Sequence, residues 1–440
     1  MSTSVLLIEI LLTPFIVTVY QTHNIQSADE LREITAAGRE LQVTASDPDL
    51  FYRTESADAF TFNDGALWGF HSASIFSSTA NKNTNNFLIS LGADGRDMNN
   101  RSAFGNGSAV SRLFLGIKYM TGNNTAINTP LYELVATGER NISLYRNIAY
   151  LPLGFLVEES MLDLTFTLEN RDSFAFQNQL FSAATGIEDE VYTPIDPTDW
   201  QFATPKNTTA TPKEPGQIIV NHTDSYDSFT VSATCQAPAD GVLTLYLATW
   251  YPNTPYTVYR NGTQLYTGKI IDTQQMFTCG TVAAGDELRV EVTHPDQTWD
   301  QLPMTLQLDG AVLNEELFLQ GFDKLNQHTL ELTEFSNTRV AGTIHCKTDG
   351  LLYTSIPQNS NWTAYIDGKK ANIALLEEAM ICLELPEGTH TVQFRYRNNA
   401  FLIGCTISAC SAAGLLICLY RKKSKSSHRK QSVEERSDAL

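Results

Sequence analysis

The feature that most constrains this chain of 440 residues is an uncharged apolar run, Ala400–Tyr420. At 1.5 Å rise per residue, a helix over this run is about 31 Å long, which matches the hydrocarbon thickness of a bilayer. The run ends directly in Arg421, Lys422 and Lys423, so the positive-inside rule predicts a cytoplasmic C-terminus. Its small residues suit close packing against another helix, and a single-pass anchor fits the segment equally well.

A second apolar segment, Val5–Tyr20, lies near the N-terminus. No Lys or Arg precedes it and no small-residue cleavage pattern follows it, so it differs from a signal peptide. A carboxyl group at membrane depth is costly, so we expect Glu9 to face other protein or water. The segment is expected to be a transmembrane helix over residues 4–20. If both segments span, residues 21–399 lie outside the cytoplasm.

Charge is distributed unevenly along the chain. The formal net charge is −19, from 30 Lys and Arg against 49 Asp and Glu. The tail after Tyr420 carries a net +4, and Glu9 is the only charge before Gln21, so residues 21–420 carry −22. A nucleic-acid binder is excluded because it needs clustered positive charge. An acidic body joined to a basic tail indicates two compartments separated by a membrane.

The pattern between the two apolar segments predicts a membrane-anchored α+β fold. Short aromatic and β-branched runs indicate a mixed α/β segment first, with a possible short helix in Asn81–Leu91. After a Pro/Thr-rich stretch, apolar and polar residues alternate with a period of two, which indicates two antiparallel β-sandwich modules. One transmembrane helix is expected before the α/β segment and one after the second module. The expected boundaries are 21–191 for the extracytoplasmic α/β domain, 192–216 for a linker, 217–297 for module 1, 298–398 for a helix plus module 2, 400–420 for the second transmembrane helix and 421–440 for the basic tail.

An internal repeat supports the two modules. Each copy places a Cys before an Asp-Gly turn, and each has a Tyr-containing strand that ends in a second turn. That second turn is Asn261-Gly262 in one copy and Asp367-Gly368 in the other, and both dipeptides are strong hairpin signals. Between the copies, Val312–Leu332 has helical apolar spacing.

Four of the seven cysteines lie at equivalent places in the two repeats. This indicates the disulfides Cys235–Cys279 and Cys346–Cys382, each contributing about 3–4 kcal/mol in the chain-entropy model. The alternative is four buried thiols. The chain has no CxxC pair and no Cys/His cluster, so we expect no metal site.

No sequence motif identifies a catalytic site. GxSxG, HExxH, Walker-type and GxGxxG patterns are lacking, so no catalytic residue and no cofactor are expected. The acidic residues Glu188, Asp189 and Glu190 are best explained as a solvated surface. Trp250, Tyr251 and Trp362 lie at strand ends beside turns and are candidates for stacking on sugar rings. Burial in a sandwich core is the usual fate of large aromatics and is the favoured placement.

Several motifs occur in an order that resembles a known family. The stretch Gly350–Gly404 contains SIPQNSNWTAYIDGKK and LPEGTHTVQFRY and leads into the apolar run. Further motifs are FYR (51–53), SASIFSST (72–79) with Asn81, LGIKYM (115–120), YRNIAYLPLGF (145–155) and FAFQNQL (174–180), together with Glu9 in the first apolar segment. In these features the chain resembles the bacterial membrane protein YfhO family.

The resemblance implies a role in the bacterial cell envelope. The family is similar to multi-spanning GT-C glycosyltransferases, which use polyprenyl-phosphate sugars outside the membrane, and some members are linked to lipoteichoic acid-like polymers. The GT-C fold carries its catalytic acid in the first outer loop, which has no counterpart here, so no catalytic residue is carried over. The chain is then expected to be a C-terminal portion, partnered by an N-terminal multi-spanning portion, the bilayer, the lipid-linked sugar and an acceptor glycopolymer.

Two hypotheses of different class therefore stand. The first is the outer, acceptor-positioning part of a multi-pass envelope glycosyltransferase in the bacterial cell membrane. The second is a non-enzymatic, membrane-anchored surface protein whose sandwiches bind glycans or a protein partner.

Overall fold

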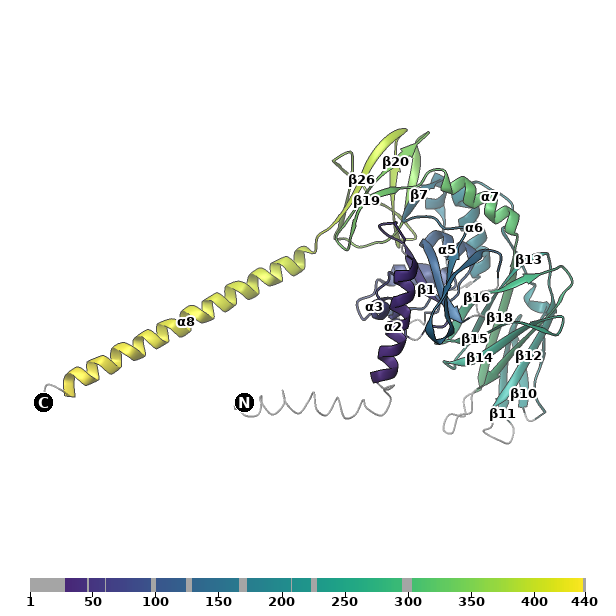
Figure 1. Cartoon of the computed structure of the whole chain (residues 1–440), viewed down its shortest axis with the longest axis horizontal. Helices are drawn as coiled ribbons and strands as arrows, with labels where there is room; N and C mark the ends of the chain where they lie inside the picture. The colour runs from purple at the N-terminus through teal and green to yellow at the C-terminus, as the bar shows by residue number, and fades with distance from the viewer. Residues whose placement is uncertain are drawn as a thin grey trace.

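The computed structural model describes residues 28–45, 47–59, 61–95, 100–123, 129–165, 172–206, 208–222, 228–294 and 303–437. The expected first transmembrane helix, with Glu9, lies outside these residues. Most of the described chain forms a body of several sheets, and a long helix, α8 (Asn399–Ser437), extends away from it (Figure 1).

Helix α8 contains the apolar run that the sequence singled out. Its segment Asn399–Arg421 is 23 residues long with a mean hydropathy of 2.1, and none of its most apolar window is buried against the body. Within the described part of the chain, this is the one helix long and apolar enough to cross a membrane. Side chains such as Phe401 and Leu416 are exposed, as expected for a helix whose surroundings are lipid.

The first part of the body mixes helices with a four-stranded sheet. The sheet order is β1 (Arg53–Ser56), β4 (Ile117–Asn123), β6 (Ile142–Asn147), β5 (Tyr132–Thr137), with β1 parallel to β4. A two-stranded pair joins β2 (Ile75–Phe76) to β3 (Arg101–Ser102). The helices are α2 (Ala28–Ala45), α3 (Asp64–Trp68), α4 (Lys82–Ser90), α5 (Ala109–Leu115) and α6 (Ser173–Thr185), with 3-10 turns at Glu139–Asn141 and Glu159–Asp163.

Helix α4 confirms the short helix predicted in Asn81–Leu91. The Asn81 side chain accepts hydrogen bonds from the backbone N–H groups of Asn83 and Thr84, which caps the first turn. Phe87, Leu88 and Ile89 are buried. Tertiary packing therefore stabilises this helix, although its asparagines have low helix propensity.

We call residues 192–313 the first β unit, which consists of two facing sheets. One has the order β10 (Thr208–Glu214), β11 (Gln217–His222), β18 (Met304–Leu313), β13 (Gly241–Thr249), β16 (Gln274–Val282), with β8 (Tyr192–Pro194) on β18. The other has the order β15 (Thr263–Ile270), β14 (Thr254–Arg260), β17 (Glu287–His294), β12 (Phe229–Gln236), β9 (Gln201–Ala203). Val231 and Val290 of one sheet share a core with Leu245 and Leu308 of the other.

Two expected boundaries are corrected by this arrangement. Residues 192–216 are not a free linker, because β8, β9 and β10 each pair with a strand of the first β unit, and Pro197–Asp199 forms a 3-10 turn. Proline is tolerated there because β10 is an edge strand, where a missing N–H breaks no ladder. Module 1 also does not end near residue 297, because β18 lies between β11 and β13.

The second β unit is completed by a strand from the α/β segment. Its outer sheet has the order β19 (Glu331–Ser336), β20 (Arg339–Cys346), β26 (Gly388–Tyr396), β22 (Trp362–Ile366), β23 (Lys369–Ala371). Its inner sheet has the order β24 (Ala374–Leu376), β25 (Met380–Leu385), β21 (Gly350–Pro357), β7 (Gly154–Val157). Helix α7 (Glu315–Asn326) connects the two β units, within the range that the apolar spacing predicted.

Both predicted hairpin turns are confirmed. Asn261 and Gly262 have φ of 49° and 77° and join β14 to β15. Asp367 and Gly368 have φ of 50° and 75° and join β22 to β23. Positive φ at both central positions is the geometry that matches the right-handed twist of the flanking strands.

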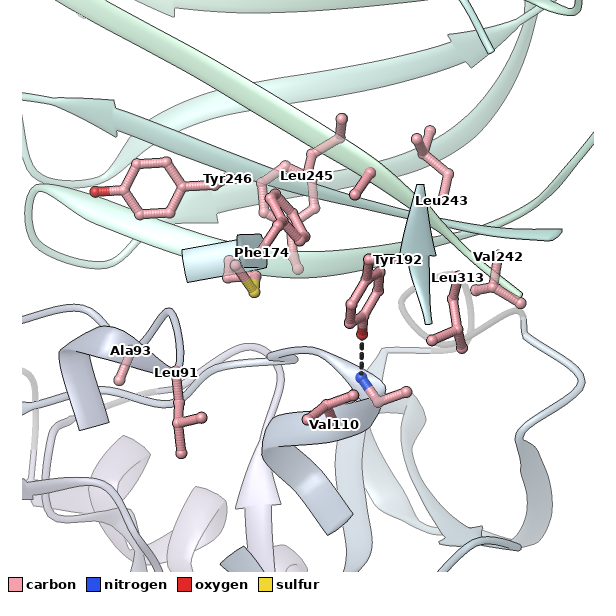
Figure 2. Close-up of a cluster of buried hydrophobic side chains, with 14 of the residues drawn as sticks. Leu91, Ala93, Val110, Phe174, Tyr192, Val242, Leu243, Leu245, Tyr246 and Leu313 are labelled. Atoms are coloured by element: carbon pink, nitrogen blue, oxygen red, sulfur yellow. Dashed lines mark hydrogen bonds between the residues drawn. The ribbon is translucent and has the colours of Figure 1, made fainter. Parts of the chain in front are cut away.

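A continuous apolar core joins the α/β segment to the first β unit. Figure 2 shows Leu91 and Val110 below the sheet that carries Leu243 and Leu245, with the Tyr192 ring reaching across. The Tyr192 hydroxyl accepts a hydrogen bond of 3.1 Å from the backbone N–H of Ala109 at the start of α5. The two parts therefore share one hydrophobic core.

The expected disulfides are not formed. Cys235, Cys279, Cys346 and Cys382 are all buried free thiols. Cys346 faces the core between the two sheets of the second β unit, whereas Cys382 faces the core shared with the α/β segment. The inner sheet thus separates the sulfur atoms of Cys346 and Cys382. Burial raises the pKa of Cys382 to about 12, which keeps the thiol protonated and unreactive.

We expect reductant to leave stability unchanged, because no disulfide constrains the unfolded chain. The measurement is the melting temperature of the detergent-solubilised chain with and without a thiol reductant. Alkylation under denaturing conditions without reductant should modify every cysteine, as read by intact mass. A fall in melting temperature on reduction, or two cysteines protected from alkylation, would contradict the free-thiol structure.

Candidate functional site

Several residues of the motifs FYR (51–53) and Gly350–Gly404 connect different secondary-structure elements of the body. Arg53 is buried, and its Nη1 donates to the Leu115 carbonyl oxygen at 2.5 Å and to Ser355 Oγ at 2.8 Å. Its Nη2 donates to the Ser355 carbonyl oxygen at 2.8 Å. The Tyr353 hydroxyl donates to the Phe114 carbonyl oxygen at 3.0 Å. These bonds tie β1, α5 and β21 together, which is a structural role.

Among the described residues of the first β unit, the exposed aromatic side chain is Trp250, which follows β13 directly. Trp250 is 66% exposed, whereas its neighbour Tyr251 is 5% exposed. The Tyr251 ring packs edge-on against His294 at 4.3 Å between centroids, and His294 stacks on Phe229 at 4.7 Å. Trp250 and Tyr251 form the bend after β13, where Tyr251 fills the core position and Trp250 points into solvent. The favoured core placement therefore holds for Tyr251 but not for Trp250.

Hydrogen bonds hold the Trp250 turn in one conformation. The Thr254 hydroxyl donates to the Tyr251 carbonyl oxygen at 2.6 Å. The Asn253 backbone N–H donates to the Ile270 carbonyl oxygen at 2.7 Å, and the Thr249 N–H donates to the Thr273 carbonyl oxygen at 2.7 Å. The indole is therefore presented on a fixed support, beside the β15–β16 connection.

That connection carries a charged group at the join with the α/β segment. Asp272 Oδ2 lies 2.5 Å from Arg101 Nη2, and both side chains are mostly buried. Asp94 is buried next to them, and its Oδ2 accepts the backbone N–H groups of Asp272 at 2.8 Å and Thr273 at 3.1 Å. Among the described residues, Asp94 Oδ1 has no hydrogen-bond partner.

The electrostatics of this group favour a proton on Asp94. Burial, and then repulsion from the Asp272 carboxylate, raise the pKa of Asp94 to about 7, although three backbone N–H groups oppose the shift. An aromatic platform beside an arginine–carboxylate pair offers an apolar face and hydrogen-bonding groups together. Sugars present the same combination, since their C–H faces are apolar and their edges carry hydroxyls. We take the Trp250 turn with Arg101 and Asp272 as the candidate site.

Trp362 lies elsewhere. It is the first residue of β22, half-buried at the margin of the second core, with its ring edge-on to Tyr396 at 5.2 Å and 72°. Trp250 and Trp362 therefore belong to different β units and do not form one site. Sequence reasoning also missed Asp94, Arg101 and Asp272, because only the fold brings residues about 180 positions apart into contact.

A shallow hollow of about 850 Å³ lies beside α7. Ile187 and Leu319 line it together with Glu315, Glu316 and Asp323. Glu188, Asp189 and Glu190 are exposed in the adjoining loop, in agreement with a solvated acidic surface. Within the described ranges, no group of three or more His, Cys, Asp or Glu side chains is arranged to hold a metal ion.

Comparison with known families gives one extensive match. A family model described as "Bacterial membrane protein YfhO" matches residues 1–408. No curated protein matches the chain.

Comparison with solved structures gives distant likenesses. The C-terminal CBM6 of LamC from Zobellia galactanivorans is 11% identical, with 28% of this chain and 98% of that chain covered and a TM-score of 0.19. A CBM36 carbohydrate-binding module in complex with calcium and xylotriose is 12% identical, with coverages of 27% and 97% and a TM-score of 0.18. The arabinofuranosyltransferase AftD from Mycobacteria is 12% identical, with coverages of 39% and only 14% and a TM-score of 0.18. Such TM-scores establish no shared fold.

Stability should depend on the protonation of Asp94. Since its pKa is raised from 3.8 to about 7 in the fold, the folded chain binds more protons than the unfolded chain between these values, and stability falls as pH rises through the window. From about pH 5 to about pH 8, we expect the wild type to lose about 2–3 kcal/mol more unfolding free energy than Asp94→Asn. Chemical denaturation of the detergent-solubilised chain measures both.

Asp309→Asn is the matched control, because burial raises the pKa of Asp309 only to about 6. Its difference from wild type should develop at lower pH than that of Asp94→Asn. Parallel pH profiles for wild type and Asp94→Asn would show that Asp94 is ionised throughout.

Proposed function

Because the chain belongs to the bacterial membrane protein YfhO family, we propose that it is the extracytoplasmic, glycan-positioning part of a GT-C-like envelope glycosyltransferase. It holds an acceptor polymer, of the lipoteichoic acid-like class, near a polyprenyl-phosphate sugar. Transfer itself belongs to a multi-spanning membrane partner of GT-C type. The residues described above contribute binding and orientation and no covalent step.

The distribution of charge supports this orientation. The apolar part of α8 is followed by a tail of net +4, and the body before it carries −22. Basic residues are retained on the cytoplasmic side, so the body lies on the outer face of the membrane. An acceptor polymer and a polyprenyl-phosphate sugar would meet on that side.

The single observation that carries the binding role is the exposed Trp250 on a fixed turn. Burying an exposed indole against the C–H face of a sugar removes apolar surface from water without ordering a loop. Asp272, on the connection bonded to this turn, and its ion-pair partner Arg101 on β3 supply an acceptor and donors for hydroxyls. This combination favours a glycan over a protein segment as the ligand.

The charge of the body selects the kind of glycan. A body of −22 repels a polyanion, although screening limits the effect to a Debye length of about 8 Å at physiological salt. We therefore expect neutral sugar units to bind more tightly than phosphate-rich ones, and divalent cations to improve the binding of the latter.

Orientation is tested by labelling thiols on intact cells with a membrane-impermeant maleimide. In a background with Cys405, Cys410 and Cys418 replaced by Ala, Thr211→Cys on exposed β10 should be labelled. Ser424→Cys in the basic tail should be labelled only after permeabilisation. The reverse pattern would overturn the proposed topology.

Binding is tested by calorimetric titration of the full chain in nanodiscs with neutral and anionic envelope glycans. Trp250→Ala should weaken binding by at least about tenfold, equivalent to about 1.4 kcal/mol. Trp250→Phe should retain part of the affinity because it keeps an aromatic face.

Leu134→Ala is the matched control, since Leu134 is also exposed, at 60%, but lies on β5. It should leave the affinity unchanged. No binding by the wild type to any glycan would remove the positioning role, and equal affinities for wild type and Trp250→Ala would place the site elsewhere.

A further inference from the structure

The strand pair β2–β3 places a second aromatic surface against the candidate site. Phe76 of β2 is directly opposite Arg101 of β3, so their side chains lie on the same face of the pair. The Arg101 guanidinium carbon lies 5.7 Å from the centre of the Phe62 ring, and the Phe62 and Phe76 ring centres are 6.5 Å apart. Phe76 is 44% exposed and Phe62 is half-buried. We call Phe62 and Phe76 the β2 platform; it adjoins the arginine that pairs with Asp272.

Asp94 fixes the β2 platform relative to the Trp250 turn. Its backbone exchanges two hydrogen bonds of 2.7 Å with Ala103, the residue directly after β3. Its carboxylate accepts the backbone N–H of Thr273 at 3.1 Å. The Thr273 carbonyl oxygen in turn accepts the N–H of Thr249, the residue before Trp250. One buried residue therefore holds the strand of Arg101 and the support of Trp250 together.

The position of the Phe76 ring is also fixed by its own segment. Asn63 Oδ1 accepts the Phe76 N–H at 2.9 Å, and Asn63 Nδ2 donates to the Phe76 carbonyl oxygen at 3.3 Å. The buried Glu55 carboxylate accepts hydrogen bonds from the hydroxyls of Ser72 and Ser74, both at 2.8 Å. A ligand that stacks on this ring would therefore not have to order the segment that carries it.

The order of chemical groups between the two aromatic surfaces matches a glycan chain. The path of contacts from Trp250 to Phe76 passes through the Arg101–Asp272 ion pair, so aromatic groups lie on both sides of polar ones. The two side chains of the pair are 16% and 11% exposed, which leaves donors and acceptors within reach of hydroxyls. Linked sugar units likewise present apolar C–H faces separated by polar edges.

A protein partner fits this arrangement less well. A stable protein interface buries at least about 1,000 Å² and has an apolar centre with few charged residues. Here the charged Arg101–Asp272 pair lies between two small aromatic surfaces. The two charges of the pair neutralise each other, which suits neutral hydroxyls better than an ionic group.

We propose that the β2 platform is a second sugar-stacking subsite of the Trp250 site, so that the ligand is a chain of several neutral sugar units and not a single sugar. This inference rests on the proposed function, because it assigns the same glycan to a longer site. The chain lies across the join between the α/β segment and the first β unit, with its middle units over the Arg101–Asp272 pair. Contact with one aromatic surface makes contact with the other intramolecular, so affinity rises with chain length.

The test is calorimetric titration of the full chain in nanodiscs with a neutral envelope glycan, cut by partial acid hydrolysis and separated by size. We expect the wild type to bind the hexasaccharide fraction at least about tenfold more tightly than the disaccharide fraction, which reaches one aromatic surface at a time. Phe76→Ala should weaken hexasaccharide binding by at least about fivefold and leave disaccharide binding at the Trp250 turn unchanged. Trp250→Ala should weaken the binding of both fractions.

Two further variants separate loss of the ring from loss of the fold. Phe76→Gln keeps a side chain of some length without an aromatic face and should behave as Phe76→Ala. Phe76→Tyr keeps the ring and should retain most of the hexasaccharide affinity. Val135→Ala is the matched control, since Val135 is 42% exposed but lies on β5, and it should change neither affinity. Circular dichroism of each variant checks that the fold is kept.

The possible failures can be told apart. Equal wild-type affinities for the two fractions, or an unchanged hexasaccharide affinity in folded Phe76→Ala and Phe76→Gln, would overturn the second subsite and leave glycan binding at Trp250 in place. Failure of the wild type to bind any fraction would overturn the proposed function, and this inference with it.

Discussion

Burial of strand β21 on both of its faces is the constraint on which the rest of the body depends. Leu352 points into the core of the second β unit, while Leu351 and Tyr353 point into the core shared with α5 and β7. A one-residue slip would move each of these side chains into the wrong core, so the register is strongly specified. The buried Arg53 guanidinium reinforces it, because losing the Ser355 partners would leave a charge unsatisfied in a dry interior.

This join has a consequence for the membrane. Two residues separate the end of β26 from the start of α8, and β26 belongs to the sheet that faces β21, so the apolar helix is attached directly to this body. The first β unit is locked to the same body through Tyr192, α5 and the shared core. A ligand at the proposed site on the Trp250 turn would therefore be held by the same body that carries α8. Such an arrangement suits positioning more than catalysis.

Short-range patterns in the sequence predicted the elements that depend mainly on neighbouring residues in the chain. The span Ala400–Tyr420, the turns at Asn261-Gly262 and Asp367-Gly368, the Asn81 cap and the helix within Val312–Leu332 all follow from length, turn chemistry or spacing. The disulfides predicted from the internal repeat were wrong. Equivalent cysteines suggested disulfides, yet the inner sheet of the second β unit lies between Cys346 and Cys382, which chain position cannot reveal. The Pro/Thr-rich stretch 192–216 was likewise predicted as a linker, because strands whose partners are distant carry a weak local signal.

The sequence by itself determined that this protein has an apolar helix able to span a membrane, an acidic body, a basic tail and a β-rich architecture, since each of these depends on composition or short-range pattern. The tertiary structure decided which polar and aromatic groups meet. It placed β7 in the second β unit, brought Asp94 and Arg101 to Asp272, and turned Tyr251 inward and Trp250 outward. Those contacts join residues separated by tens to hundreds of positions, and their free energy comes from burial and pairing that exist only when the whole chain is folded.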